Sequence, residues 1–452
     1  MGFLGNIVGK IKEPVVRPRS RVPIYVLLIM IILVAFFLRV NHLEIPAKRI
    51  GDEVYYVPNA LEILGIPSNA TNPYAGQSHP PLGKMIIAVG ISLFGDNPVG
   101  WRIMSVVFGT LMIPVFYLLV INLLRDKPSK YIVGLLAAFF LSFENLTFYF
   151  SRVARIDIYM LFFLILGLYF LSTRWKWRWL AAGVSFSLAF LSKEAALVVI
   201  LPIIAWLSFV TIKEEVKIID KKRKKKIRQV ERKWIFDRQR FKEGVLVSIV
   251  FVVSTIVFWY VFEWIILEPK FPDFFTRVSG MVSRLGIDRP ARGRSEPWQW
   301  LINQPPTRAI GVMSGANIDL ASLSPVGPLF NPHLEYAYWI QINWLLLLVT
   351  LPIVAYLLYR SISDEAARLC AAWWIGSYFI WLIIRFIYRG LTYLFYYLPL
   401  IPPIVIGISF FLGERVHKEA SGRFKSRAWT IVTIIYSIAY LFYFFYLYPV
   451  PI

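Results

Sequence analysis

The sequence predicts an all-α polytopic membrane protein. Of its 452 residues, 58% are hydrophobic and 17% are aromatic, and the mean hydropathy is +0.60. This composition is too apolar for a soluble protein. Apolar stretches of about 18 residues recur along the chain, and a helix of that length crosses the hydrocarbon core of a bilayer. The single cysteine, Cys370, lies in one such stretch, so the sequence predicts neither a disulfide framework nor a cysteine-rich metal site.

Eleven apolar stretches are long enough to be membrane-spanning helices. They lie at about residues 23–40, 99–124, 131–149, 156–172, 179–193, 195–211, 244–266, 341–359, 368–386, 393–413 and 428–448. The basic N-terminus leads into the first stretch without a small-residue cleavage site, so we expect no cleaved signal peptide. No repeat of 20 to 50 residues is apparent, which argues against a solenoid.

The distribution of basic residues predicts how the chain is oriented. The net charge is +22, and 32 of the 49 lysines and arginines fall on one side if the N-terminus is cytoplasmic. This positive-inside pattern predicts a multi-pass protein of the cell membrane with a cytoplasmic N-terminus. The densest basic run, Lys221 to Lys226 in the connection 213–243, lies between two spans. We therefore expect it to meet anionic lipid headgroups rather than nucleic acid.

Two long segments face outward in this orientation. The first, residues 41–98, contains stretches of helical apolar spacing at 54–64 and 85–94, which suit helices lying in the membrane interface. The second, residues 267–340, is rich in Pro, Gly, Arg and Trp, and a loop of this length is functional or disordered. The chain thus divides into an N-terminal transmembrane module (1–266), an outer loop (267–340) and a C-terminal transmembrane module (341–452).

Adjacent carboxylates, Asp52 and Glu53, follow the first span. They could simply be the negative first turn of a helix, which the helix macrodipole favours. However, further charged residues recur at the outer ends of other spans, and charges at membrane depth are costly and suggest a functional site. These residues are Arg102, Arg152, Arg155, Asp157, Lys193, Glu194, Arg385 and Arg389. A shared cavity at one membrane face would bring several of them together.

Sugar transfer from a polyprenyl phosphate is the chemistry that suits such a cavity. A phosphate leaving group requires Arg or Lys to hold it and to stabilise its developing charge. The acceptor hydroxyl has a high pKa and requires a carboxylate within hydrogen-bond reach to take its proton. The prenyl tail requires a lipid-exposed groove, which a helical bundle can supply.

Motifs along most of the chain resemble those of the dolichyl-phosphate-mannose protein O-mannosyltransferases, members of the GT-C superfamily. The matching residues are Gly51-Asp52-Glu53, His79-Pro80-Pro81-Leu82-Gly83-Lys84, Trp101-Arg102, Ser151-Arg152 with Asp157, Ser192-Lys193, Ser295 to Trp300, and Tyr396-Tyr397-Leu398-Pro399. The chain departs from the family at Arg155, where an apolar residue is usual, and at Tyr396, where His is usual. The outer loop is too short for the soluble β-trefoil insert of eukaryotic members, which indicates the compact prokaryotic or archaeal type.

The resemblance implies that mannose moves with inversion from a polyprenyl (dolichyl) phosphate to Ser or Thr hydroxyls of proteins. It implies a catalytic role for Asp52 as the base and for Glu53 as a second carboxylate that positions the acceptor. Donor phosphate contacts are expected from Arg102, Arg152, Lys193 and Arg389. Acceptor-side or structural support is expected from His79, Asp157, Trp298, Trp300 and Tyr397. No metal or other cofactor is expected, and relatives are often dimers with a related subunit.

Two other functions compete with this interpretation. A GT-C transferase that acts on a lipid or glycan, such as a lipid A aminoarabinose transferase, shares the Asp-Glu pair but usually has Lys-Pro-Pro where this chain has His79-Pro80-Pro81. A transporter is less consistent with the sequence, because transporters tend to carry internal repeats and broken helices. The acceptor and the sugar are left open by the sequence.

Overall fold

A computed structural model describes residues 21–68, 79–208, 211–221, 225–266, 275, 279, 295–303, 310–313, 316–319, 334–338, 340–387, 390, 392–424 and 426–448. The N-terminal part folds into a series of helices. They are α1 (Val22–Val40), α2 (Glu53–Ile63), α3 (Leu82–Phe94), α4 (Pro98–Leu123), α5 (Lys130–Ser142), α6 (Asn145–Phe150), α7 (Asp157–Ser172), α8 (Arg178–Ser192), η2 (Glu194–Ala196), α9 (Leu197–Ser208) and α10 (Arg238–Ile266).

The C-terminal part adds further helices, which are α12 (Pro297–Trp300), α13 (Trp344–Ser361), α14 (Glu365–Phe386), η5 (Leu394–Leu400), α15 (Ile401–Ala420) and α16 (Ala428–Tyr446). Each of the eleven predicted spans coincides with helix in the described residues. Seven of the described helices are long and apolar enough to cross a membrane, and shorter apolar helices lie at the other predicted spans. The chain is a multi-pass membrane protein whose bundle is built of α-helices, and the number of eleven spans stays a prediction.

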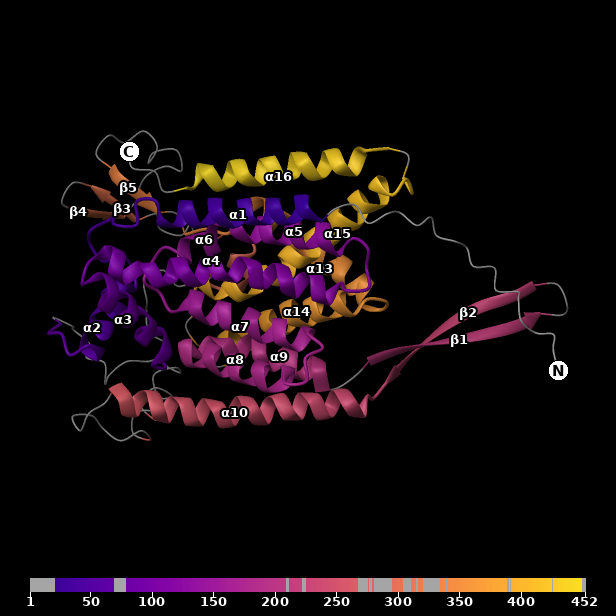
Figure 1. Ribbon diagram of the computed structural model, residues 1–452, viewed down its shortest axis with the longest axis horizontal. Helices are drawn as coiled ribbons and strands as arrows, with labels where there is room; N and C mark the ends of the chain where they lie inside the picture. The colour runs from indigo at the N-terminus through magenta and orange to yellow at the C-terminus, as the bar shows by residue number, and fades with distance from the viewer. Residues whose placement is uncertain are drawn as a thin grey trace.

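The long helices run roughly parallel to the long axis of the molecule (Figure 1). In this view α16 runs along one edge and α10 along the opposite edge, and the C-terminal end of α16 meets the C-terminal end of α1. The hydroxyl of Tyr448, just after α16, donates to the carbonyl of Leu38 in α1 over 3.0 Å. The N-terminal and C-terminal modules therefore pack together in one bundle.

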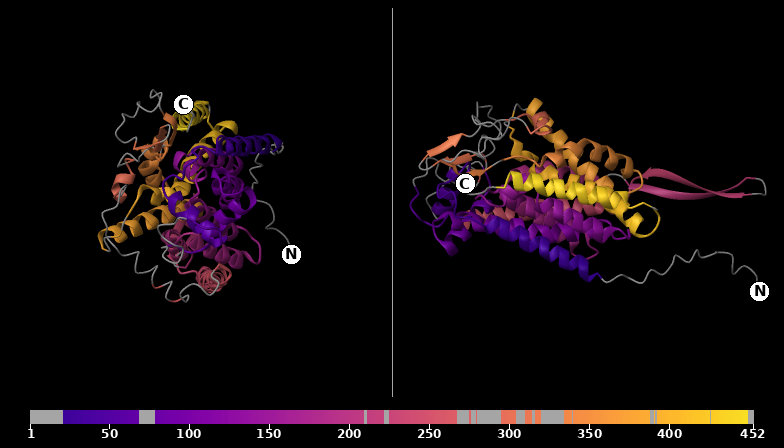
Figure 2. Two further views of the ribbon diagram at one scale, coloured as in Figure 1. Left: turned by 90° about the vertical axis from the view of Figure 1, so that its left-hand side faces the viewer. Right: turned by 90° about the horizontal axis from the view of Figure 1, so that it is seen from above.

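The predicted helices of the first outer segment are present at one end of this bundle, as α2 and α3 (Figure 1). Two small sheets were not predicted. Strands β1 (Thr211–Lys221) and β2 (Lys225–Ile235) form an antiparallel hairpin that extends from the other end. Strands β3 (Ile310–Met313), β4 (Ala316–Asp319) and β5 (Leu334–Tyr338) form a sheet of order β4-β3-β5 at the end of the molecule opposite this hairpin (Figure 2). Both sheets lie in connections between helices, where the alternation of polar and apolar residues is weak. Strands form there because the backbone N–H and carbonyl groups need hydrogen-bond partners.

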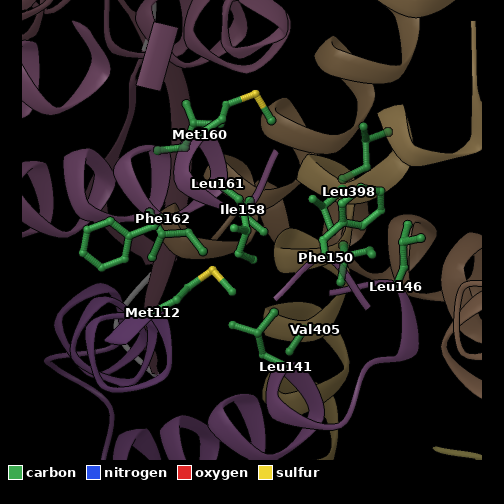
Figure 3. Packing of buried hydrophobic residues seen from close by; sticks show 14 of the residues in the cluster. Met112, Leu141, Leu146, Phe150, Ile158, Met160, Leu161, Phe162, Leu398 and Val405 are labelled. Carbon is green, nitrogen blue, oxygen red and sulfur yellow. The ribbon is translucent and has the colours of Figure 1, made fainter. Parts of the chain in front are cut away.

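A buried apolar core joins the two modules near the predicted site. Met112 of α4, Leu141 of α5 and Ile158 of α7 lie close to Leu398 of η5 and Val405 of α15 (Figure 3). These side chains fix the helices whose ends carry the charged residues. The core therefore sets the positions of the loop before α7 and of η5.

The span predicted at 131–149 is divided into two helices, α5 and α6. The division occurs at Glu144, whose buried carboxylate caps α6 by accepting the backbone N–H of Thr147 at 2.6 Å. Its other oxygen accepts the backbone N–H of Asn343 at 3.1 Å, at the start of α13. The two hydrogen bonds satisfy the buried carboxylate of Glu144, which would be costly without partners. They thereby stabilise the break between α5 and α6.

Candidate functional site

The Asp52 carboxylate is presented at the start of α2. The preceding residue, Gly51, has a φ of +51°, which is a left-handed conformation that glycine adopts readily and other residues adopt at a cost. Asp52 occupies the N-cap position, yet its side chain caps no N–H among the described residues of α2. The side chain is 35% exposed. It is thus accessible from the end of the bundle, and its oxygens are not used to cap the helix.

Glu53, in contrast, is completely buried and paired with Arg102 of α4. Nε and Nη2 of Arg102 each donate to one carboxylate oxygen of Glu53 over 2.9 Å. The remaining N–H groups of the guanidinium donate to the carbonyls of Leu43, Pro46 and Lys48. The Glu53 oxygens also accept the backbone N–H groups of Ile50 and Ala154. All five N–H groups of Arg102 are therefore used inside the protein.

Arg152 is engaged in a comparable way at the end of α1. Its Nη1 donates to the carbonyl of Leu38 over 2.6 Å, and its Nη2 donates to the carbonyls of Asn41 and His42 over 2.7 and 3.2 Å. These carbonyls are at the C-terminus of a helix, where no intrahelical N–H is available to them. The side chain is fully buried. Arg102 and Arg152 thus both hold the chain after α1 through its carbonyls, and the phosphate contact expected of them stays a prediction.

A second group of charges surrounds Asp157, at the first position of α7. Its Oδ1 accepts a hydrogen bond from Nζ of Lys193 over 2.6 Å, and its Oδ2 accepts one from Nε of Arg155 over 3.3 Å. Nη2 of Arg155 also lies 2.5 Å from Oδ2 of Asp52. The four side chains form a chain of alternating charge, which we call the Asp52–Lys193 charge chain. It brings the exposed carboxylate of Asp52 into direct contact with a buried cation.

The aromatic residues of η5 cover the two cations of this chain. The Phe395 ring centroid lies 4.3 Å from Cζ of Arg155 and 4.7 Å from Nζ of Lys193. The neighbouring Tyr396 ring lies 5.3 Å from the same Nζ. Cations over aromatic faces gain electrostatic stabilisation in buried surroundings. We call the rings of Phe395 and Tyr396 the aromatic wall; they are uncharged, so they contact these cations without neutralising them.

The charges also affect nearby titratable groups. Burial lowers the pKa of Arg155, but the carboxylates of Asp52 and Asp157 raise it by more, so the net shift is upward and the guanidinium stays charged. On α2, burial and then the Asp52 carboxylate raise the pKa of Tyr56 well above its usual value. Both directions are those expected for groups beside the Asp52 carboxylate, which lies 2.5 Å from Arg155.

His79, the first residue of the His-Pro-Pro motif, lies beside this cluster. Its Nδ1 is 2.8 Å from Oε2 of Glu194 and its ring is 5.9 Å from that of Tyr56. Gly83 of the same motif allows close packing, because a Cβ there would lie 2.5 Å from Cγ2 of Ile156 and 2.9 Å from the carbonyl oxygen of Ser192. The motif thus packs α3 against the residues next to Arg155, Asp157 and Lys193.

The tryptophan-rich segment docks behind η5. Trp300 is fully buried, donates its indole N–H to Oγ of Ser295 over 2.9 Å, and packs edge-on against Trp381. Trp381 in turn stacks on Tyr396, with ring centroids 4.3 Å apart. Trp298 is exposed and stacks on Phe386 of α14. Tyr397 is buried against Trp300, with its hydroxyl 3.4 Å from the Trp374 indole nitrogen. Trp300 and Tyr397 support the wall, and Trp298 faces outward.

The structure thus brings together Asp52, Asp157 and Lys193 of the predicted site, with His79 beside them. Arg389 lies outside the described residues. The site also contains Arg155, Glu194, Tyr56 and Phe395, to which the sequence assigned no role. The unusual charge at Arg155 was the signal that could have identified it. Among the described residues, no group of three His, Cys, Asp or Glu side chains could hold a metal ion.

Comparisons with known proteins agree with the sequence motifs. Residues 78–224 match the family model described as dolichyl-phosphate-mannose-protein mannosyltransferase. A polyprenol-phosphate-mannose–protein mannosyltransferase of Mycobacterium tuberculosis is 31% identical over 140 residues, which cover 31% of this chain and 26% of the relative. Its counterpart in Corynebacterium glutamicum is 34% identical over 122 residues, covering 25% and 22%. The matches therefore span about a quarter of these relatives.

Solved structures share the fold over most of the chain. The protein O-mannosyltransferase Pmt1–Pmt2 complex of S. cerevisiae, bound to the sugar donor, aligns with a TM-score of 0.64 and 11% identity, covering 93% of this chain and 89% of that one. ArnT of Cupriavidus metallidurans aligns with a TM-score of 0.51 and 17% identity, covering 90% and 62%. The chain therefore shares the fold of these two structures, and its residues 78–224 match the model of the dolichyl-phosphate-mannose-protein mannosyltransferases.

Proposed function

We propose that this protein is a glycosyltransferase that moves mannose from a polyprenyl-phosphate donor to Ser or Thr hydroxyls of proteins, with inversion at the anomeric carbon. The observation that carries the proposal is the contact between Asp52 and Arg155. It places an accessible carboxylate next to two buried cations that share one further carboxylate, Asp157. A base beside a cationic site is what transfer from a phosphate leaving group requires.

In the proposed reaction, the acceptor oxygen attacks the anomeric carbon of the donor sugar. The bond from that carbon to the phosphate oxygen breaks, and its electron pair stays on the phosphate as polyprenyl phosphate leaves. The acceptor proton goes to the Asp52 carboxylate. Lys193 and Arg155 stabilise the charge that develops on the phosphate, because cations fixed in a buried site need little reorganisation.

Lys193 is favoured as a phosphate contact over the arginines expected at this role. Among the described residues, Nζ of Lys193 has one hydrogen-bond acceptor, Asp157, although an ammonium group can donate three hydrogen bonds. Arg102 has used all five of its N–H groups. Glu53 is the buried partner of Arg102, so we assign it to holding the loop before α2 rather than to chemistry.

We further propose that this end of the bundle lies on the outer face of the cell membrane. The hairpin β1–β2, which belongs to the most basic connection, extends from the opposite end (Figure 1). Basic connections stay on the cytoplasmic side of a membrane. A protein substrate would then reach Asp52 from outside, with Trp298, which is 46% exposed, available to contact it.

A transfer assay in membranes tests the proposal. The donor is polyprenyl-phosphate mannose labelled in the sugar, the acceptor is a Ser/Thr-rich peptide, and the Asp52→Asn variant is compared with the wild type. We expect labelled peptide with the wild type and a loss of at least about 100-fold in the variant, because general-base catalysis contributes about 10²–10⁴-fold. The Glu44→Gln variant is the matched control, since Glu44 is an acidic residue with a 58% exposed side chain before α2.

Three results would lead to different conclusions. Label in a lipid or glycan fraction would support the proposed donor and show that the acceptor is a lipid or glycan and not a protein. Unchanged turnover by Asp52→Asn would overturn the role of Asp52. No transfer of the sugar to peptide, lipid or glycan would overturn the proposed function.

A further inference from the structure

We propose that the donor phosphate and the Asp52 carboxylate compete for Arg155, so that donor binding releases Asp52 for its role as base. The proposal rests on the proposed function and concerns the same site. It adds to the phosphate contact proposed for Arg155 a second role, that of holding Asp52 until the donor binds, which neither the motifs nor the comparisons assign. It also predicts an order of events, in which the donor enters before Asp52 can accept the acceptor proton.

The contact between Arg155 and Asp52 is close but does not satisfy the guanidinium. Nη2 of Arg155 lies 2.5 Å from Oδ2 of Asp52. Nevertheless, Nη2 is buried and has no partner of hydrogen-bond geometry among the described residues. The side chain of Arg155 is only 6% exposed. A buried N–H group without a well-aligned acceptor is unfavourable, so an incoming anion with suitable geometry can replace the carboxylate.

The second cation lies where it can share such an anion. Lys193 and Arg155 bind the two oxygens of Asp157 and lie over one ring, that of Phe395. Within the described part of the chain, the Nη1 atom of Arg155 has no hydrogen-bond acceptor, and Nζ of Lys193 has only Asp157. Phosphate oxygens accept hydrogen bonds from both types of cation. The pair is therefore a two-point site for a phosphate group.

The charge balance explains why the carboxylate and the phosphate exclude each other. The Asp52–Lys193 charge chain contains two acidic and two basic residues, so it is neutral when all four are ionised. Adding a phosphodiester anion while Asp52 stays in place would leave one excess negative charge in a buried site, which is costly. Asp52 can leave without being buried elsewhere, because its side chain is 35% exposed.

The released carboxylate then faces the solvent-accessible end of the bundle, from which an acceptor would approach. Both of its oxygens become available to the acceptor hydroxyl. Before the donor binds, Oδ2 is held against Arg155. Binding of the phosphate to Arg155 and Lys193 would thus release the Asp52 carboxylate at the same time.

The test is a double-mutant cycle on binding of polyprenyl phosphate without a sugar, measured at equilibrium with the detergent-solubilised full chain. The Asp52→Asn variant removes the competing charge and keeps the side-chain shape. We expect it to bind polyprenyl phosphate about tenfold more tightly than the wild type, which corresponds to about 1.4 kcal/mol. In the Arg155→Gln background the same substitution should change the affinity by less than about twofold, because the contested cation is gone.

Two controls separate competition from a general charge effect. Glu44→Gln removes an exposed negative charge before α2 and should leave the affinity unchanged. A polyprenol without phosphate should bind the wild type and Asp52→Asn equally. Melting temperatures of all variants show whether each one is folded, and Arg155→Lys should recover part of the affinity that Arg155→Gln loses.

The outcomes distinguish this inference from the proposed function. Equal binding of polyprenyl phosphate by the wild type and Asp52→Asn would overturn the competition and leave the transferase proposal standing. A tenfold gain that persists in the Arg155→Gln background would show a general charge effect and would also overturn the competition. If neither protein binds polyprenyl phosphate, both the donor class and the competition are excluded.

Discussion

Arg102 binds both carboxylate oxygens of Glu53 in a fully buried ion pair, with Nε and Nη2 each at 2.9 Å. The pair joins α4 to the beginning of α2. The same guanidinium holds the carbonyls of residues 43, 46 and 48, which belong to the connection before Asp52. The pair therefore determines where the neighbouring Asp52 carboxylate lies, although neither of its members is accessible.

Breaking this pair is expected to destabilise the protein. Glu53→Gln leaves the buried guanidinium of Arg102 without its counter-charge, and such changes cost about 3–5 kcal/mol. The measurement is the thermal unfolding of the solubilised protein, with Glu62→Gln as the control, since Glu62 is a partly buried residue of the same helix, α2. Unchanged stability together with a specific loss of donor affinity would instead support the phosphate contact expected for Arg102.

Gly51 allows a second test of how Asp52 is positioned. Gly51→Ala places a Cβ on a residue with a φ of +51°, which is expected to cost about 1 kcal/mol and to shift the start of α2. Transfer activity should fall by more than the loss of stability explains. Gly65→Ala is the matched control, because Gly65 follows the same helix and has a φ of +68° with no atom within 4 Å of its Cβ position. Equal losses of activity in the two variants would contradict the positioning role.

The aromatic wall should act through ring shape rather than through the hydroxyl group of Tyr396. Tyr396→Phe keeps the stack on Trp381 and the face presented to Lys193, so donor affinity should change by less than about twofold. Tyr396→Leu removes both contacts and should weaken binding of polyprenyl phosphate by about tenfold, from the loss of about 1 kcal/mol or more. A comparable loss in both variants would show that the hydroxyl itself contacts the donor.

The basic connection is expected to serve the membrane and not the chemistry. Replacing the run from Lys221 to Lys226 by Ser and Gly removes six basic residues from the connection 213–243, whose strands β1 and β2 extend from the end opposite α2. Turnover in detergent should be unchanged, whereas binding to vesicles that contain anionic lipid should weaken by about 1 kcal/mol per residue removed. The measurement compares both quantities in one preparation. A loss of turnover in detergent would show that this connection contributes to the reaction.

Several features could be predicted from the sequence because they depend on local properties. The length of each apolar stretch predicted the helices, and the position of the Lys and Arg residues predicted that the basic connection lies opposite Asp52. The His-Pro-Pro-Leu-Gly-Lys motif supported the resemblance to the protein mannosyltransferases, and residues 78–224 match the model of that family. The break at Glu144 was not predicted, because the stretch is apolar on both sides and only the distant N–H of Asn343 completes the environment of that carboxylate.

The sequence by itself determined that a membrane bundle carries acidic and basic residues at one end, since apolar length and charge are properties of the chain alone. Only the tertiary structure decided which cations remain available. Arg102 and Arg152 are surrounded by carbonyls from residues 38 to 48, which packing brings to them, and these acceptors use their donors. Arg155 and Lys193 contact carboxylates and aromatic rings, and within the described residues their side chains donate to no backbone carbonyl. The number of acceptors around a buried cation depends on segments distant in sequence, so residue type and spacing could not reveal it.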